Sequence, residues 1–181
     1  LELGLLRQWL RLLDVTSGGP VQVTGHFVEK MESSGDYDFI KGWGTTATPS
    51  LIANSSDQQV RIPGIARPHS IFVHPSPTLF VAAGWQSPVS GVVKVEAEIQ
   101  DAHPECGNGV EWWVLHRTFD GSRILKTARL DGAGRGSMES RAIAVKKGEV
   151  IALVVGPKDG SHACDLTRVD FRLAESAVSY T

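Results

Sequence analysis

Strict alternation of apolar and polar residues in the C-terminal half constrains the fold of this chain more than any other feature. Apolar side chains occupy every second position over residues 93–100, and residues 167–173 repeat the pattern. This period places one face of a strand on a core and the other in water. Further short strands, separated by turn-forming residues, are predicted at residues 59–62, 70–74, 110–117, 123–130, 141–145 and 149–155. Many short strands with turn signals between them predict an all-β fold, an antiparallel β-sandwich that is jelly-roll-like.

The N-terminal segment has a different period. Leu5, Leu6, Trp9 and Leu10 recur at helical spacing over residues 1–13, which predicts a short N-terminal amphipathic helix. The run Thr-Ser-Gly-Gly-Pro that follows is typical of a helix end.

These two periods suggest a division of the chain. We interpret residues 1–19 as a helical connector from an upstream domain that docks on the sandwich, the alternative being a helix that packs on its own domain's core. Residues 20–175 form the β-sandwich module, with a first strand expected at residues 21–28, and residues 176–181 are a tail.

Composition excludes two classes of partner. The formal net charge is −2 and the basic residues are dispersed along the 181-residue chain, so no basic patch predicts a nucleic-acid partner. No apolar run approaches the roughly 20 residues that a membrane helix needs. We therefore expect no nucleic-acid binding and no membrane span.

The two cysteines lie in separate turn-forming motifs. Cys106 stands in His-Pro-Glu-Cys-Gly-Asn-Gly and Cys164 in a Gly-, Asp- and Ser-rich stretch, and both motifs adjoin predicted strands. Such residues favour tight turns, which places both cysteines on loops at strand ends and favours a disulfide between them. Neither cysteine belongs to a C-x-x-C-H motif, so we expect no haem attachment. Their isolation also argues against structural zinc.

A pairing of the cysteines would gather polar side chains at one rim of the sandwich. These side chains are His103, Glu105, Asp159, His162 and Asp165. Carboxylates and backbone carbonyls suit calcium, with Asp101 and Asp165 as the candidate metal ligands and Asp159 as a further one. The alternative is that these residues only form local turns. No nucleophile elbow, phosphate-binding loop or zinc-protease helix is present, so we predict that the chain is not an enzyme.

Two tryptophans are candidate sugar platforms. Alternation over residues 110–117 buries Trp112 and leaves Trp113 on the opposite face of the strand. An indole ring can stack on a sugar while neighbouring polar groups bind the hydroxyls. Trp113 and Trp85 are therefore ligand-binding candidates, and packing beneath a loop, a helix or the core is the alternative for both.

Several turn motifs carry a resemblance to a known group of proteins. They lie at residues 62–64, 68–70, 74–77, 84–88, 103–110 and 156–167. Over roughly residues 40–175, the chain resembles the non-catalytic β-sandwich region of large planctomycete cytochrome c-containing multidomain proteins. The second half is more distantly similar to jelly-roll carbohydrate-binding and galactose-binding-like modules. The resemblance implies an accessory module of an exported multidomain parent, located in the periplasm or outside the cell.

These observations predict a non-catalytic carbohydrate-binding module. Its ligand would be a polysaccharide or glycan, bound at Trp113, Trp85 or the rim residues His103, Glu105, Asp159 and His162. Calcium is the one cofactor that the rim suggests. The alternative function is a structural module that contacts neighbouring domains of its parent and binds no small ligand.

Overall fold

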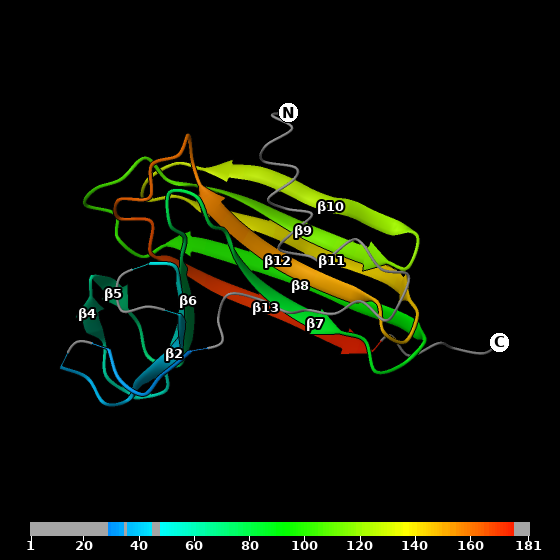
Figure 1. Cartoon of the computed structure of the whole chain (residues 1–181), viewed down its shortest axis with the longest axis horizontal. Helices are drawn as coiled ribbons and strands as arrows, with labels where there is room; N and C mark the ends of the chain where they lie inside the picture. The colour runs from blue at the N-terminus through cyan, green and yellow to red at the C-terminus, as the bar shows by residue number, and fades with distance from the viewer. Residues whose placement is uncertain (1–28, 35, 45–47, 176–181) are drawn as a thin grey trace.

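The computed structural model describes residues 29–34, 36–44 and 48–175, and these residues form strands and turns. Two antiparallel sheets pack face to face, with a small hairpin at one end (Figure 1). The larger sheet has seven strands in the order β1-β2-β3-β6-β13-β8-β11, and the smaller has four in the order β10-β9-β12-β7. The all-β sandwich prediction is therefore confirmed. The helix predicted over residues 1–13 and the strand predicted over residues 21–28 lie outside the described residues.

The strand bounds follow the chain order in Figure 1. They are β1 Lys30–Met31, β2 Ile40–Gly44, β3 Ser50–Asn54, β4 Val60–Ile62, β5 Gly64–Ala66, β6 Ser70–His74, β7 Val81–Gln86, β8 Gly91–Asp101, β9 Val110–Thr118, β10 Gly121–Leu130, β11 Arg135–Val145, β12 Val150–Pro157 and β13 Thr167–Glu175.

The main core lies between the two sheets and follows the predicted alternation. Val95 and Ile99 of β8 are fully buried, and they belong to one cluster with Trp112 of β9 and Leu153 of β12. Trp112 has no exposed surface, which confirms the predicted phase of β9. The long alternating strands therefore supply the core of the sandwich, as period-two patterning requires.

The four-stranded sheet carries a second apolar cluster on its other face. Leu115, Ala152 and Val154 are buried there, and Trp113 packs against them. Every residue of β12 is buried as a result, so this strand shows no alternation in burial.

Strands β1 to β3 extend the seven-stranded sheet beyond the main core. Ile40 of β2 and Ile52 of β3 pack with Phe72 of β6 beneath the β4–β5 hairpin. The sequence did not reveal β2 or β3, partly because β2 contains two glycines. Gly42 is required there, since a Cβ at this position would collide with the carbonyl oxygen of Leu51 on the neighbouring strand.

The strands β5 and β7 were also missed, and the turn motif at residues 62–64 forms the tight turn between β4 and β5. Within the described residues, no helix is long and apolar enough to cross a bilayer.

Candidate functional site

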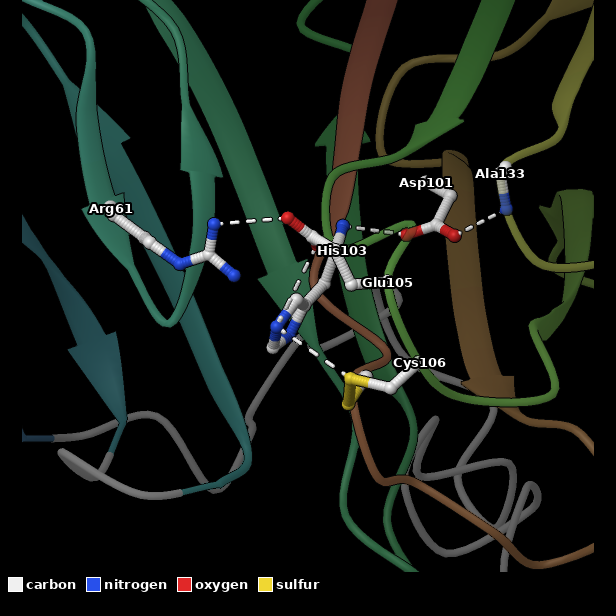
Figure 2. Close-up of a disulfide and its surroundings, with 7 residues drawn as sticks. Arg61, Asp101, His103, Glu105, Cys106 and Ala133 are labelled. Carbon is white, nitrogen blue, oxygen red and sulfur yellow. Dashed lines mark hydrogen bonds and ion pairs between the residues drawn. A yellow bond between two sulfur atoms is a disulfide. The ribbon is translucent and has the colours of Figure 1, made fainter.

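The loops at one end of the sandwich are joined by a disulfide. Cys106 and Cys164 are bonded across a sequence separation of 58 residues, with their Cα atoms 5.6 Å apart. The β8–β9 loop carries the first cysteine and the β12–β13 loop carries the second. The predicted pairing is confirmed, and it forms the end of the molecule that we call the disulfide rim (Figure 2).

Asp101 organises the disulfide rim through hydrogen bonds from two loops. One of its carboxylate oxygens accepts the backbone N–H of His103 at 2.7 Å, and the other accepts that of Ala133 at 2.6 Å. Figure 2 shows the carboxylate between these two donors. The His103 ring then lies with its Nε2 atom 3.6 Å from the Sγ atom of Cys106. Asp101 therefore fixes the β8–β9 loop against the β10–β11 loop.

The other predicted rim residues divide among different partners. The exposed Glu105 accepts a hydrogen bond from the Arg61 guanidinium at 2.9 Å. Its own backbone N–H, followed by Arg61, lowers the pKa of the Glu105 carboxyl. Asp159 lies 3.8 Å from Arg129. These contacts show two solvated ion pairs, which contribute little to stability.

A histidine pair borders the disulfide rim. The ring of His162 meets that of the buried His74 edge to face, with 6.1 Å between their centroids. Burial is the largest cause that lowers the pKa of His74, and the charges of His162 and His103 act in the same direction. His74 is therefore held neutral in the fold near neutral pH.

Asp165 is the unusual carboxylate of the disulfide rim. Its residue is only 2% exposed, and neither carboxylate oxygen has a hydrogen-bond partner. Burial first, and then the charge of Asp101, raise the pKa of Asp165 to about 7. The structure therefore brings the two predicted metal ligands, Asp101 and Asp165, into electrostatic contact.

The rim does not offer thiolate ligands for a metal. Ligand atoms of His103, Cys106 and Cys164 lie within 4.8 Å of one another. Both sulfur atoms belong to the disulfide, so neither is the thiolate that zinc binds. A metal at this rim would therefore be held by oxygen atoms or imidazole nitrogens, not by sulfur.

The two tryptophan candidates are half-buried. Trp113 lies on the outer face of the four-stranded sheet, where its ring centroid is 5.6 Å from that of Phe80. Trp85, on the edge strand β7, packs against the main core. Each ring therefore has packing partners, and neither is a fully open platform.

A cleft at the opposite end of the sandwich was not found from the sequence. It is lined by residues of the β9–β10 turn, the β11–β12 turn and the adjoining strands, and its volume is about 550 Å³. Both turns lie at the right of Figure 1. We call this cleft the hairpin cleft. Most of its lining residues carry polar side chains, and they comprise His116, Thr118, Asp120, Gly121, Ser122, Arg123, Ala144, Lys146 and Glu149. Ligand pockets commonly hold about 300 to 1,000 Å³, so the hairpin cleft has the size of a binding site.

Two buried side chains joined by a hydrogen bond are part of the lining of the hairpin cleft. His116 continues the core-facing row of β9, and its Nε2 atom is 2.9 Å from the Oε2 atom of Glu149. The same oxygen accepts the backbone N–H of Lys146 at 2.9 Å, which closes the β11–β12 turn. The pair therefore joins β9 to this turn and holds the polar lining in place.

An exposed aromatic residue stands at the same end. Phe119 is 47% exposed and lies in sequence between the lining residues Thr118 and Asp120. Its ring approaches Gly148, since a Cβ on that glycine would lie 3.2 Å from it. The sequence signal that could have indicated this region is His116, a polar residue in the otherwise apolar core-facing row of β9.

The disulfide rim is less hollow than the hairpin cleft. A small cavity beside Asp101 and Pro104 holds about 70 Å³, well below the usual size of a ligand pocket. The polar cluster expected at the rim is thus present, but much of it is engaged in contacts among its own loops.

No family model and no curated protein matches this sequence. Among solved structures, the chain is similar to CBM51 from Clostridium perfringens GH95, described in complex with methyl-galactose. The identity is 13%, the TM-score is 0.46, and the match covers 83% of this chain and 90% of the other. It is also similar to TmCBM61 in complex with beta-1,4-galactotriose, with 14% identity, a TM-score of 0.44, and coverage of 83% of this chain and 90% of that one. At these identities and scores, the matches assign neither a family nor a ligand to this chain.

Proposed function

We propose that this chain is a non-catalytic carbohydrate-binding module and that a glycan binds in the hairpin cleft. The observation that carries the proposal is a cleft of about 550 Å³ lined mainly by residues with polar side chains, among them the buried His116–Glu149 pair, beside the exposed ring of Phe119. A pyranose presents hydroxyl groups around its edge and C–H groups on its faces. Polar side chains and an aromatic ring are the groups that bind those two surfaces.

The chemistry of the hairpin cleft suits hydroxyl-rich ligands. Asp120 accepts hydrogen bonds, Arg123 and Lys146 donate them, and Thr118 and Ser122 do both. The cleft contains both signs of charge, so neutral sugars and uronic acids are both compatible with it. Phe119 supplies the apolar surface on which a ring can stack.

The same geometry supports binding without catalysis. The Nε2 atom of His116 is engaged by Glu149, and its Nδ1 atom is buried. Neither ring nitrogen is therefore presented to a ligand as an acid or a base, which a catalytic histidine requires.

The proposal includes an exported parent protein with several domains, as the resemblance to planctomycete cytochrome c-containing proteins implies. The disulfide supports this part, because structural disulfides form and persist in oxidising compartments such as the periplasm and the extracellular space.

Affinity electrophoresis against a panel of neutral and acidic polysaccharides tests the proposal. We expect at least one to retard the wild-type chain, with a dissociation constant in the millimolar to micromolar range, or about −4 to −8 kcal/mol. Phe119→Ala and Arg123→Ala should each weaken binding about tenfold or more, equivalent to about 1.4 kcal/mol. Trp43→Ala is the matched control, because Trp43 on β2 is also 47% exposed but lies away from the cleft.

The same experiment tests the candidate sites that were predicted from the sequence. Trp113→Ala and His162→Ala should leave retardation unchanged if the glycan binds in the hairpin cleft. Loss of binding in either variant, with Phe119→Ala unaffected, would move the site to the sheet face or to the disulfide rim. Retardation by no polysaccharide would contradict the proposed function.

An interdomain scaffold is the second candidate function. The exposed apolar side chains of Trp43 and Ile71 on the seven-stranded sheet, which are 47% and 46% exposed, favour it. Exposed apolar surface can mark a contact with another protein or domain. This function predicts that the chain binds no polysaccharide and that Trp43→Asp disrupts assembly with the neighbouring domains of the parent.

A further inference from the structure

The buried carboxylate of Asp165 requires a neutralising partner. The residue is 2% exposed, and both of its carboxylate oxygens lack a hydrogen bond. Burying an ionised carboxylate without a partner is strongly unfavourable. A proton or a cation must therefore compensate its charge in the folded state.

The strand register places a second carboxylate beside it. Thr167, the first residue of β13, pairs with Asp101, the last residue of β8. Asp165 precedes Thr167 by two residues, and after burial the nearby charge of Asp101 is the second cause that raises its pKa. Asp101 is already oriented by the N–H groups of His103 and Ala133, and each of its oxygens retains a lone pair for another contact.

Further oxygen atoms surround the position of Gly107. A Cβ at this glycine would lie 2.6 Å from the carbonyl oxygen of Ala163 and 3.5 Å from Oδ1 of Asp165. The adjacent Asn108 has a buried Oδ1 atom without a hydrogen-bond partner. The Ala163 carbonyl oxygen and the Asp165 carboxylate thus both lie close to Gly107, and the next residue along the chain carries an unpartnered amide oxygen.

The chemistry of these donors selects the cation. Within the described ranges, no set of three carboxylates gathers at this place, and the unpartnered oxygens beside Gly107 are neutral or belong to Asp165. Calcium accepts 6–8 oxygen ligands of mixed type in flexible geometry, whereas magnesium demands a near-ideal octahedron. Zinc prefers nitrogen and sulfur ligands.

We propose that Asp165 and Asp101 bind a calcium ion at the disulfide rim, with neutral oxygens from the loop around Gly107 completing the site. The ion compensates the buried carboxylate and ties the β8–β9 loop to the β12–β13 loop beside the disulfide. The proposal is independent of glycan binding, because the hairpin cleft is formed by the turns at the opposite ends of β9 and β12.

Calcium titration of the whole chain, with its disulfide intact and after removal of metals by chelation, tests this proposal. Isothermal calorimetry should detect one saturable site with a dissociation constant on the order of 10⁻⁵ to 10⁻³ M. Saturating calcium should also raise the melting temperature, since an ion that binds only the folded state stabilises that state. Magnesium at the same concentration should produce a smaller shift.

Three variants assign the site. Asp165→Asn should abolish calcium binding, and Asp101→Asn should weaken it. Asp159→Asn is the matched control, because Asp159 is an exposed carboxylate on the same β12–β13 loop, and it should bind calcium as the wild type does.

The order of the melting temperatures of the wild type and Asp165→Asn, with and without calcium, distinguishes a bound cation from a bound proton. In chelator, Asp165→Asn should melt at the same temperature as the wild type or above it, because the variant removes an uncompensated charge. In calcium, the wild type should melt at the higher temperature. The proposal would be overturned if the wild type showed neither a heat of calcium binding nor a rise in melting temperature with calcium. It would also be overturned if Asp165→Asn and Asp159→Asn lost calcium binding equally. The wild-type titration decides the matter even if a variant does not fold.

Discussion

The two ends of the sandwich are built on the same strands but differ in what their side chains contact. At the disulfide rim, a covalent bond and the hydrogen bonds of Asp101 fix long loops to one another. At the hairpin cleft, short turns leave Phe119 and several polar side chains open to solvent above the His116–Glu149 pair. We therefore expect the rim to stabilise the fold and the cleft to bind the ligand. Substitutions at the two ends should therefore separate stability from binding.

The largest loss is expected between the two ends, in the core that both share. Trp112→Ala should cost about 3 to 5 kcal/mol of unfolding free energy, as large-to-small core changes do, because Trp112 is fully buried. Trp113→Ala should cost less, since this residue is half-buried on the opposite face of β9. Denaturant melts of the two variants check this order, and equal losses would show that the two faces of β9 are equally packed.

Removal of the disulfide should affect the rim alone. The double variant Cys106→Ala and Cys164→Ala should lose roughly 3 to 4 kcal/mol on the chain-entropy model, because it opens a loop of 58 residues. Its glycan affinity, measured at a temperature where it remains folded, should match that of the wild type. Loss of affinity in the folded variant would mean that the two ends are coupled.

Disruption of the buried His116–Glu149 pair at the cleft should have an intermediate effect on stability. His116→Ala leaves the carboxylate of Glu149 without its side-chain partner and should cost about 1 to 3 kcal/mol, as unsatisfied buried groups do. Glycan affinity should fall too, since the pair holds the lining in place. Chemical denaturation and calorimetry of the same sample measure both quantities. An unchanged affinity would show that the pair serves the fold only.

Exposed residues of the hairpin cleft should contribute least to stability. Phe119→Ala should change the unfolding free energy by no more than about 0.5 kcal/mol, the usual range for surface positions, because the residue is 47% exposed. A loss above about 1 kcal/mol in denaturant melts would indicate instead that Phe119 packs as part of the fold.

Local sequence patterns were sufficient for the rim and for most strands. Residues such as Pro104, Gly107 and Asn108 mark turns without knowledge of the fold, so the cysteine loops and their pairing were predictable. Alternation identified β8, β9 and β13 for the same reason. Strand β2 was missed because Gly42 and Gly44 interrupt its pattern, and Gly42 is explained only by the close approach of Leu51 on β3.

The hairpin cleft depends on long-range pairing and was therefore missed. His116 and Glu149 are 33 residues apart in the sequence, and they meet only because β9 and β12 are neighbours in one sheet. No local sequence motif predicts that these two residues are in contact. The burial of Asp165 is of the same kind, since its position in a turn predicted an exposed carboxylate as readily as a buried one.

Mapping of a bound oligosaccharide by NMR tests the central claim most directly. The isotope-labelled chain would be titrated with a fragment of the polysaccharide that retards it most, and the backbone amide shifts would be followed. We predict that the largest shifts fall in residues 118–123 and 146–149, the two turns that form the hairpin cleft, and that they are greatly reduced in Phe119→Ala. Shifts confined to the disulfide rim or to the strand face of Trp113, or saturation without any shift in the two turns, would contradict the account.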